Sequence, residues 1–313
     1  MTIYYVKTDG NDGNTGLSWD AAWLSLNKVF LSAQDADIVY VRDGTYTGVN
    51  NRGRTCNGRE ITLVSESGPT NCILDAEGAN RHLIMNSAEK TLEIDGFTFK
   101  NGYISNEGGS IYMSGSSGDN PTPTFKNCIW ENCYVDGATN FGGAIYAAFS
   151  GPTLINCVFD SCYSAVFHGG AIFYSHGDQQ GPTILTLTNC TMYNCSAGGN
   201  GGAIYATDDN VTLNNCIFNS CSAAGDGDEF YTAFGSVISL NYSCYDDTAG
   251  YYADSGFGGG SISIDGNCIT DDPLLNTNLS LASNSPCIDA GKNSYNAETT
   301  DIVGNPRKVY GGV

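Results

Sequence analysis

The chain has 313 residues, of which 41% are hydrophobic and 15% charged, so it is neither wholly disordered nor collagen-like. Thirteen Lys and Arg against 33 Asp and Glu give a net charge of -20, which argues against a nucleic-acid partner. No apolar run approaches the roughly 18 residues of a membrane helix, so direct membrane insertion is not expected.

Basic residues are unevenly placed along the chain. Between Lys126 and Lys292 there is no Lys or Arg, while the same stretch carries 16 Asp or Glu. This stretch therefore has no basic side chain of its own with which to hold an anionic group.

The first 50 residues are expected to form an N-terminal cap and the first coil of the fold. Residues 18–33 place apolar side chains at helical spacing, with Ser18 or Asp20 as the N-cap. A short helix here would cover the open end of the core and block edge pairing.

A Gly-rich loop precedes this predicted helix and carries the oxygen-bearing side chains that calcium prefers. These residues are Asp9, Asn11, Asp12 and Asn14. Their spacing is not that of an EF-hand, so a capping turn is the other interpretation. We otherwise expect no cofactor.

Two motifs alternate through the middle of the chain at intervals of roughly 26 to 34 residues, as in a repeat protein. The first is Asn-Cys followed five residues later by a second Cys, and its copies begin at Asn127, Asn156, Asn189 and Asn215. The second is Gly-Gly-Ala/Ser-Ile-Tyr/Phe, and its copies begin at Gly108, Gly142, Gly169 and Gly201.

Each repeat contains three strand-length stretches bounded by turn residues, and no helix-length segment. This pattern describes one coil of a right-handed parallel β-helix, which buries its inner face only against neighbouring coils. We predict an all-β, single-domain β-helix of about eight or nine coils. The coils would occupy residues 51–270, and 271–313 would form an irregular closing segment.

Equivalent residues of successive coils should stack in columns. The repeat asparagines would form a tight corner with a side-chain ladder, and Ile111, Ile145, Ile172 and Ile204 would point inward. An aromatic stripe would then face outward, and its residues are Tyr112, Tyr146, Phe173 and Tyr205. This stripe is the predicted ligand-binding surface, because sugars stack on aromatic rings; a self-stacking ladder is the alternative.

Eight of the 13 cysteines belong to the repeat and should form two columns of buried thiols. Vertical disulfides are the alternative, although parallel stacking holds Cβ atoms about 4.8 Å apart, beyond the favoured separation. Cys56 and Cys72, in an early loop-rich coil, are the pair predicted to form a disulfide. No CxxC pair indicates a zinc site.

The opening YYVKTDGNDGNTGLSWDAAW and IVYVRDGTY resembles the entry segment of bacterial pectate-lyase-like right-handed β-helix proteins. The repeats are similar to those of adhesin-like and polymorphic outer-membrane-type passenger domains, and the closing NLSLASNSPCIDAGKN resembles the end of secreted β-helix proteins. The resemblance implies an extracellular or cell-surface location. Because MTIYYVKTDG lacks the features of a secretion signal, that location would imply a signal already removed.

Catalysis by a β-helix hydrolase would need paired carboxylates. The candidates are Asp208 with Asp209, then Asp226, Asp228 and Glu229, and finally Asp246 with Asp247. Asp208 and Asp209 follow a repeat strand and rank first, although solvated corners are the competing interpretation. A lyase is disfavoured, because the repeat body has no Lys or Arg to act as base.

These patterns favour an extracellular or cell-surface module for adhesion or glycan binding that is not catalytic. Its partner would be a polysaccharide or a host or cell-surface glycan. A polysaccharide-degrading enzyme, more readily a hydrolase than a lyase, is the first alternative. A structural unit that self-associates end to end is the second.

Overall fold

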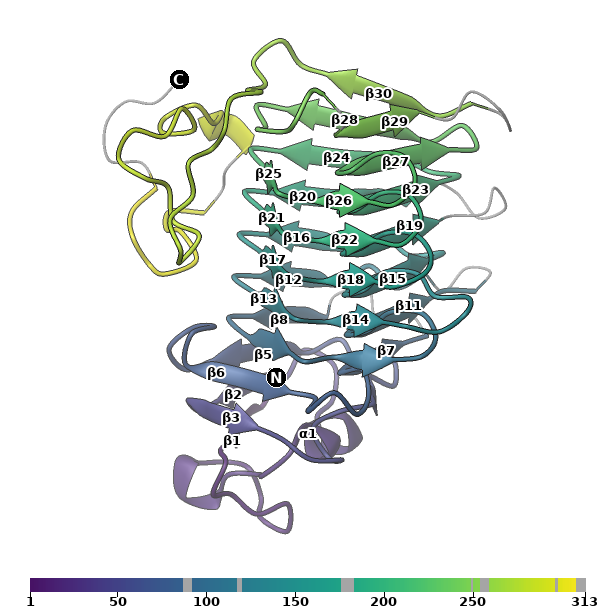
Figure 1. Cartoon of the computed structure of the whole chain (residues 1–313). Coiled ribbons are helices and arrows are strands. Elements are labelled where there is room, and N and C mark those ends of the chain that lie inside the picture. The colour runs from purple at the N-terminus through teal and green to yellow at the C-terminus, as the bar shows by residue number, and fades with distance from the viewer. Residues whose placement is uncertain are drawn as a thin grey trace.

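The chain winds into a parallel β-helix whose coils stack along one axis (Figure 1). The computed structural model describes residues 1–86, 92–116, 120–175, 183–248, 250–253, 259–295 and 298–307. Seven successive coils place a strand in each of three large parallel sheets, and incomplete coils add strands at both ends. The predicted β-helix with its short N-terminal helix is confirmed. The predicted eight or nine coils lie between the seven complete coils and the ten strands of the largest sheet.

Sheet 1 has ten strands: β1 (Ile3–Val6), β2 (Ile38–Val41), β5 (Thr62–Ser65), β8 (Glu93–Asp95), β12 (Thr124–Lys126), β16 (Thr153–Ile155), β20 (Leu185–Thr188), β24 (Val211–Asn214), β28 (Val237–Asn241) and β30 (Ser261–Ile264). Sheet 2 has eight: β4 (Arg54–Thr55), β7 (Leu83–Met85), β11 (Ile111–Ser114), β15 (Ile145–Ala148), β19 (Ile172–Ser175), β23 (Ile204–Thr207), β27 (Phe230–Ala233) and β29 (Tyr251–Ala253).

Sheet 3 has seven strands: β3 (Gly44–Tyr46), β6 (Cys72–Asp75), β9 (Thr98–Lys100), β13 (Ile129–Glu131), β17 (Val158–Asp160), β21 (Thr191–Tyr193) and β25 (Ile217–Asn219). The small sheet 4 has five: β10 (Tyr103–Ile104), β14 (Tyr134–Val135), β18 (Tyr163–Ser164), β22 (Ser196–Ala197) and β26 (Ser222–Ala223). A complete coil runs through sheets 1, 3 and 2 in that order, and five of the seven also have a sheet 4 strand between sheets 3 and 2.

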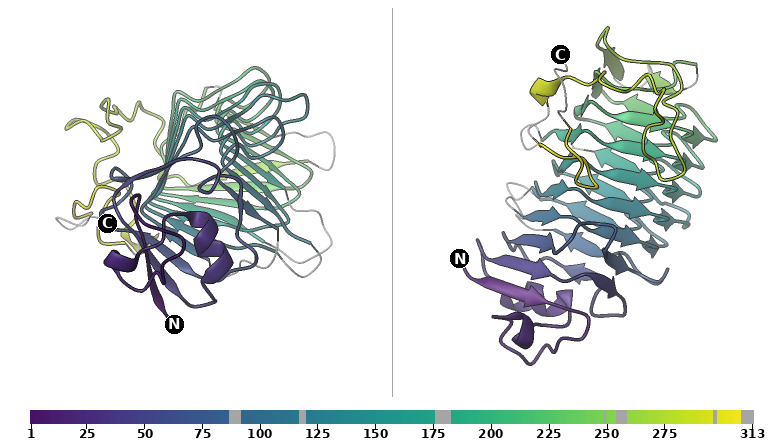
Figure 2. Two further views of the ribbon diagram at one scale, coloured as in Figure 1. Left: turned by 90° about the horizontal axis from the view of Figure 1, so that it is seen from below. Right: turned by 90° about the vertical axis from the view of Figure 1, so that its left-hand side faces the viewer.

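The N-terminal end of the core is covered by α1 (Leu26–Ser32), which buries Leu26, Val29 and Phe30 (Figure 2). The predicted single helix over 18–33 is wrong in its first half, where only the 3₁₀ turn η1 (Trp19–Ala21) forms. The chain between them is extended, because the Trp23 N–H donates to the Tyr5 carbonyl at 2.8 Å and ties it to β1. None of the helices within the described ranges has the length and hydropathy to cross a membrane.

The stacked columns follow the repeat as predicted. Ile111, Ile145, Ile172 and Ile204 pair in register through sheet 2 and are fully buried. Asn127, Asn156, Asn189 and Asn215 form the corner between sheets 1 and 3, which we call the Asn corner. All four have φ between 49° and 56°, and each amide from Asn156 onward donates to the amide oxygen of the coil below at 3.1–3.2 Å.

The repeat cysteines line the core as thiols, so the predicted columns are confirmed and the vertical disulfides are absent. The Cys128 and Cys157 thiols donate to backbone carbonyls of the coil below at 3.5 Å. The predicted Cys56–Cys72 disulfide is wrong, since both residues are buried free thiols. Cys72 lies in β6 of sheet 3 while Cys56 follows β4 of sheet 2, so the two occupy different walls of the coil.

Beyond Thr270 the described residues contribute only isolated bridges and the 3₁₀ turn η2 (Asn293–Tyr295). We call the described residues from 271 to 307 the closing segment. It lies along the side of the β-helix, beside the ends of β21 and β25 (Figures 1 and 2). Asn215 anchors it, because the Lys292 N–H donates to Oδ1 of Asn215 at 2.8 Å.

Candidate functional site

The aromatic stripe is assembled on sheet 2 as predicted, but its ring faces are occupied. Tyr112, Tyr146, Phe173 and Tyr205 stack on one another with centroid separations of 5.2–5.3 Å and interplanar angles of 3–8°. Phe173 and Tyr205 are only 8% and 9% exposed. The faces of these rings are therefore covered by their neighbours in the ladder.

Asp208 and Asp209 act in a turn. Asp208 has φ +66° and accepts the Thr207 hydroxyl at 2.9 Å, and Asp209 accepts the N–H groups of Thr183 and Asn210 at 3.0 and 2.7 Å. These bonds hold the loop that follows β23. Neither residue lines either of the two pockets described below.

In the loop predicted to bind calcium, the side chains of Asn11, Asp12 and Asn14 form hydrogen bonds within the N-terminal cap. Asp12 accepts the N–H groups of Leu24 and Ser25 at 2.8 and 3.0 Å and the Ser25 hydroxyl at 2.6 Å, which fixes the start of α1. Asn11 accepts the Gly13 N–H, and the Asn14 amide donates to the Ala22 carbonyl. Asp9 is exposed and pairs with Lys7 at 3.5 Å. This arrangement fits the capping turn and does not fit a calcium site.

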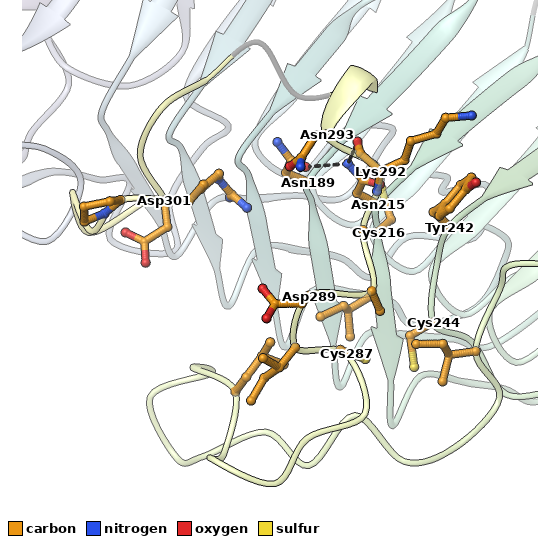
Figure 3. A pocket seen from close by; sticks show the side chains of 18 residues that line it. Asn189, Asn215, Cys216, Tyr242, Cys244, Cys287, Asp289, Lys292, Asn293 and Asp301 are labelled. Carbon is orange, nitrogen blue, oxygen red and sulfur yellow. Dashed lines mark hydrogen bonds between the residues drawn. The ribbon is translucent and has the colours of Figure 1, made fainter. Parts of the chain in front are cut away.

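A pocket of about 330 Å³ opens between the closing segment and the Asn corner (Figure 3). We call it the closing pocket. Its coil side is lined by Asn189, Asn215 and Tyr242, and its outer side by residues of the closing segment, including Lys292 and Arg307. The pocket therefore exists only because the closing segment folds back onto coils far from it in sequence.

Two basic residues line the closing pocket, and the Lys292 side chain extends away from its interior (Figure 3). The Lys292 ammonium lies 5.1 Å from the ring centre of Tyr242 and 5.3 Å from that of Tyr295. Arg307 donates through Nε to the Thr300 carbonyl at 3.0 Å, and burial lowers the pKa of its guanidinium. Neither joins an ion pair within 4.0 Å in the part of the chain that the structure describes.

Sequence reasoning missed Lys292 and Arg307 as site residues. It correctly found no basic residue between Lys126 and Lys292, but the closing segment brings both cations onto the coils of that stretch. One signal was available in the sequence. Lys292 is the first Lys or Arg after Lys126, which sets it apart from the uncharged or acidic stretch before it.

A second pocket of about 330 Å³ gathers two of the three predicted carboxylate groups. We call it the acidic pocket, and its acidic residues are Asp228, Glu229, Asp246, Asp247, Asp271 and Asp272. Asp226 and the Asp208–Asp209 pair lie outside it. Within the described residues, no three His, Cys, Asp or Glu side chains are grouped so as to hold a metal ion.

Glu229 is the unusual member of the acidic pocket. Its carbonyl accepts the Ile204 N–H at 2.8 Å, just as Ala203 accepts from Ile172 one coil below, so Glu229 stands where lower coils carry a small residue. The side chain is 2% exposed, and Oε2 accepts the Asp246 N–H at 3.0 Å. Burial, reinforced by the charges of Asp246 and Asp228, raises the pKa of this carboxyl well above its usual value.

The raised pKa of Glu229 predicts a loss of stability as the pH rises. The folded protein holds a proton here that the unfolded chain releases near pH 4.5, so the stabilising contribution is complete below that pH and declines above it. Glu229→Gln keeps a neutral side chain of the same size. We expect urea midpoints of this variant to fall less between pH 5 and 8 than those of the parent; equal slopes would contradict the assignment.

The sequence matches no family of known proteins and no curated protein. The structure is similar to that of a rhamnogalacturonan lyase, with a TM-score of 0.51 and 14% identity over 91% of this chain and 88% of that chain. A pectate lyase, Pel9A, has a TM-score of 0.45 and 13% identity, covering 97% of this chain and 87% of its own. A pectin methylesterase from Aspergillus niger has a TM-score of 0.38 and 12% identity, covering 86% of each chain. The first similarity shows a pectin lyase-like fold.

Proposed function

We propose that this protein is a polysaccharide-binding β-helix module that holds an acidic glycan in the closing pocket. The observation that carries the proposal is that Lys292 and Arg307 line this pocket over coils with no basic residue of their own, and that neither forms an ion pair within 4.0 Å among the described residues. Because Arg307 is partly desolvated, a ligand carboxylate would recover charge-assisted hydrogen bonds that water supplies incompletely. An extracellular or cell-surface location and a role in adhesion are parts of the proposal that rest on the resemblance of the repeats.

The other charged residues of the closing pocket restrict the class of ligand that it can bind. Asp289 and Asp301 also line it, so a densely charged polyanion would meet repulsion beside the two cations. A polymer whose uronates are separated by neutral sugars fits better, since the aspartates can accept sugar hydroxyls. Tyr242 and Tyr295 offer aromatic surface beside Lys292. A rhamnogalacturonan, the polymer for which the structurally similar lyase is named, is the probe of choice.

Replacing both cations, as Lys292→Gln with Arg307→Gln, is expected to weaken binding of rhamnogalacturonan at least tenfold. Each lost charge-assisted hydrogen bond is worth about 1.5–3 kcal/mol. Isothermal titration calorimetry measures the change. The matched control is Lys126→Gln, because Lys126 is also basic but already pairs with Glu93 at 3.2 Å. An equal loss in the control, or no loss in the double variant, would contradict the proposal.

The same incubations distinguish a binding module from an enzyme. Binding without new reducing ends or absorbing unsaturated products supports the module, with Asp208 and Asp209 kept as turn residues. New reducing ends would instead identify a hydrolase. Glu229 of the acidic pocket would then be the carboxylic acid to replace, because it is the described carboxyl group that burial most clearly favours in the protonated form.

A further inference from the structure

Two thiols from distant parts of the chain meet in the closing pocket. Cys244 follows β28 near the C-terminal end of the stack, where its N–H donates to the Cys216 carbonyl at 2.8 Å, and Cys287 belongs to the closing segment. Both line the closing pocket (Figure 3). Each of the two thiols shifts the pKa of the other, and the Cys244 thiol also lies 3.3 Å from the Asp271 carbonyl.

This pair differs from the thiol columns of the core. Column cysteines sit on parallel strands whose register keeps their Cβ atoms about 4.8 Å apart, which disfavours a disulfide. Cys287 lies on irregular chain that no ladder holds at that spacing. It is also partly exposed, whereas all but one of the column thiols are buried.

The surroundings of Cys287 favour its thiolate, which is the nucleophile in disulfide exchange. The Cys244 thiol lowers the pKa of Cys287. The Ser285 hydroxyl accepts the Cys287 backbone N–H at 3.1 Å and so holds this residue in place. Cys268, the other partly exposed thiol outside the columns, has its pKa raised by burial and donates to the Leu240 carbonyl at 3.5 Å. Cys287 therefore combines access, activation and a resolving partner.

We propose that Cys244 and Cys287 are a redox latch that closes by exchange with a low-molecular-weight disulfide such as oxidised glutathione. The Cys287 thiolate attacks one glutathione sulfur, which forms a mixed disulfide and releases one glutathione thiolate. Cys244 then loses its proton and attacks the Cys287 sulfur, which forms the protein disulfide and releases the second glutathione. Two electrons and two protons pass from the protein dithiol to the two glutathione molecules.

Closing the latch would clamp the closing segment onto the C-terminal end of the stack. Cys287 lies five residues before Lys292, whose backbone N–H and carbonyl already bond to the Asn215 side chain. The disulfide would therefore hold one of the two pocket cations in place. This effect on ligand binding rests on the proposed function, whereas formation of the disulfide does not.

Mass spectrometry tests the disulfide directly. The parent protein, incubated with oxidised glutathione, is expected to lose about 2 Da through removal of two hydrogens. Alkylation without reduction should then leave Cys244 and Cys287 unmodified. Trypsin would leave both cysteines on one peptide, because no Lys or Arg lies between Lys126 and Lys292. A protease that cleaves before aspartate instead separates Cys244, Cys268 and Cys287, and should yield a crosslinked peptide pair containing Cys244 and Cys287.

Variants make the assignment specific. Cys287→Ser should abolish the crosslink, while the matched control Cys268→Ser should retain it. A crosslink that persists in Cys287→Ser, or an oxidised parent in which Cys244 and Cys287 remain alkylated, overturns the proposal.

Hydrogen exchange and ligand binding then measure the consequence. Amides of residues 285–295 are expected to exchange at least tenfold more slowly in the crosslinked protein, and an unchanged rate would overturn the clamping role. Rhamnogalacturonan should bind more tightly to the crosslinked form. If the crosslink forms and slows exchange but neither form binds an acidic glycan, the proposed function fails and the latch stands. If the ligand binds but no crosslink forms, only the latch fails.

Discussion

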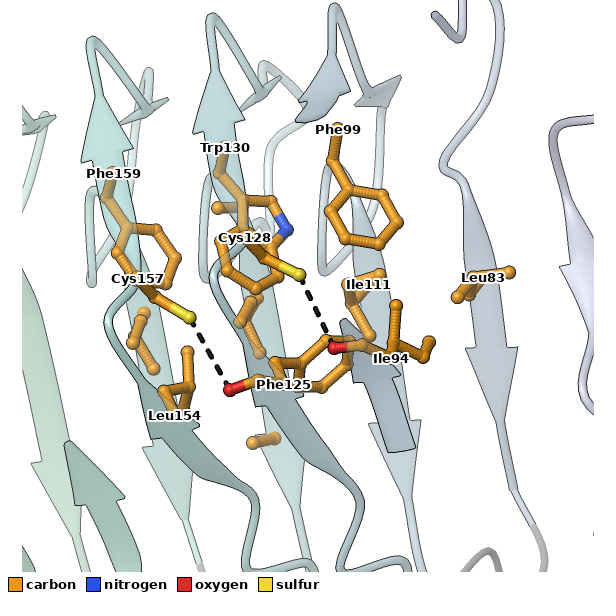
Figure 4. Packing of buried hydrophobic residues seen from close by; sticks show 14 of the residues in the cluster. Leu83, Ile94, Phe99, Ile111, Phe125, Cys128, Trp130, Leu154, Cys157 and Phe159 are labelled. Atoms are coloured by element: carbon orange, nitrogen blue, oxygen red, sulfur yellow. Dashed lines mark hydrogen bonds between the residues drawn. The ribbon is translucent and has the colours of Figure 1, made fainter. Parts of the chain in front are cut away.

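Replacing Trp130 by alanine is expected to lower the free energy of unfolding by about 3–5 kcal/mol, the usual cost of removing a large buried aromatic side chain. Trp130 is fully buried on β13, between Phe99 and Phe159 of the neighbouring coils (Figure 4). Its ring centroid lies 5.1 Å from that of Phe99 and 4.6 Å from that of Phe159, and both pairs are stacked. Alanine would break this column in the middle of the molecule.

The matched control for this prediction is Trp130→Phe. The Trp130 indole N–H is buried and has no hydrogen-bond partner, so removing it forfeits no bond. Phenylalanine would retain stacking on both neighbours, and we expect a loss below about 1.5 kcal/mol. Urea unfolding of both variants is monitored by far-UV circular dichroism, because a fluorescence signal would depend on the tryptophan that is replaced. Equal losses would show that the column does not depend on aromatic packing at this coil.

Replacing Asn215 by alanine is expected to cost about 3–4 kcal/mol and to release the closing segment. The change removes the Asn215 bond to Asn189 at 3.1 Å and two bonds to the Lys292 backbone at 2.8 and 3.2 Å, each worth about 1 kcal/mol. Alanine must also adopt φ +53°, at a further cost of about 1 kcal/mol. Faster proteolysis within residues 276–295 would reveal the release.

Asn194→Ala is the control for the release. Asn194 has φ 52° at the opposite end of the sheet 3 strands, and its amide donates to the Ser161 hydroxyl at 3.0 Å. Its replacement should cost about 2 kcal/mol, from one hydrogen bond and the strained backbone, and should leave proteolysis of the closing segment unchanged. Accelerated cleavage in both variants would mean that the segment responds to general destabilisation and not to its anchor at Asn215.

These two predictions concern different requirements of the proposed function. Trp130 contributes to the rigid stack of coils, whereas Asn215 positions the closing segment that carries Lys292 and Arg307. A variant that is stable but has lost its closing segment should fail to bind an acidic glycan. The closing pocket is therefore a property of how the segment docks.

Where the sequence prediction failed, long-range contacts overrode a local pattern. The helical spacing of residues 18–33 is real, but Trp23 pairs with β1 and interrupts the helix. Cys56 and Cys72 are near in sequence, yet the coil places them on different walls. Glu229 was predicted only as one member of a carboxylate group. Its special position could have been read from the sequence, because Gly227-Asp228-Glu229-Phe230-Tyr231 aligns with the Gly-Gly-Ala-Ile-Tyr motif from Gly201, with an acid in place of alanine.

Sequence alone determined the β-helix, the inward isoleucines, the Asn corner and the thiol columns. This was possible because stacked parallel coils place each residue next to the equivalent residue of the following repeat. Residues that recur at the repeat period are therefore in contact in the structure. Only the tertiary structure decided that the aromatic faces cover one another, that six carboxylates share a pocket, and that Lys292, Arg307 and Cys287 reach the coils. The closing segment has no repeat, and its docking depends on hydrogen bonds to Asn156 and Asn215 from residues 77 to 144 positions away, which no local pattern encodes.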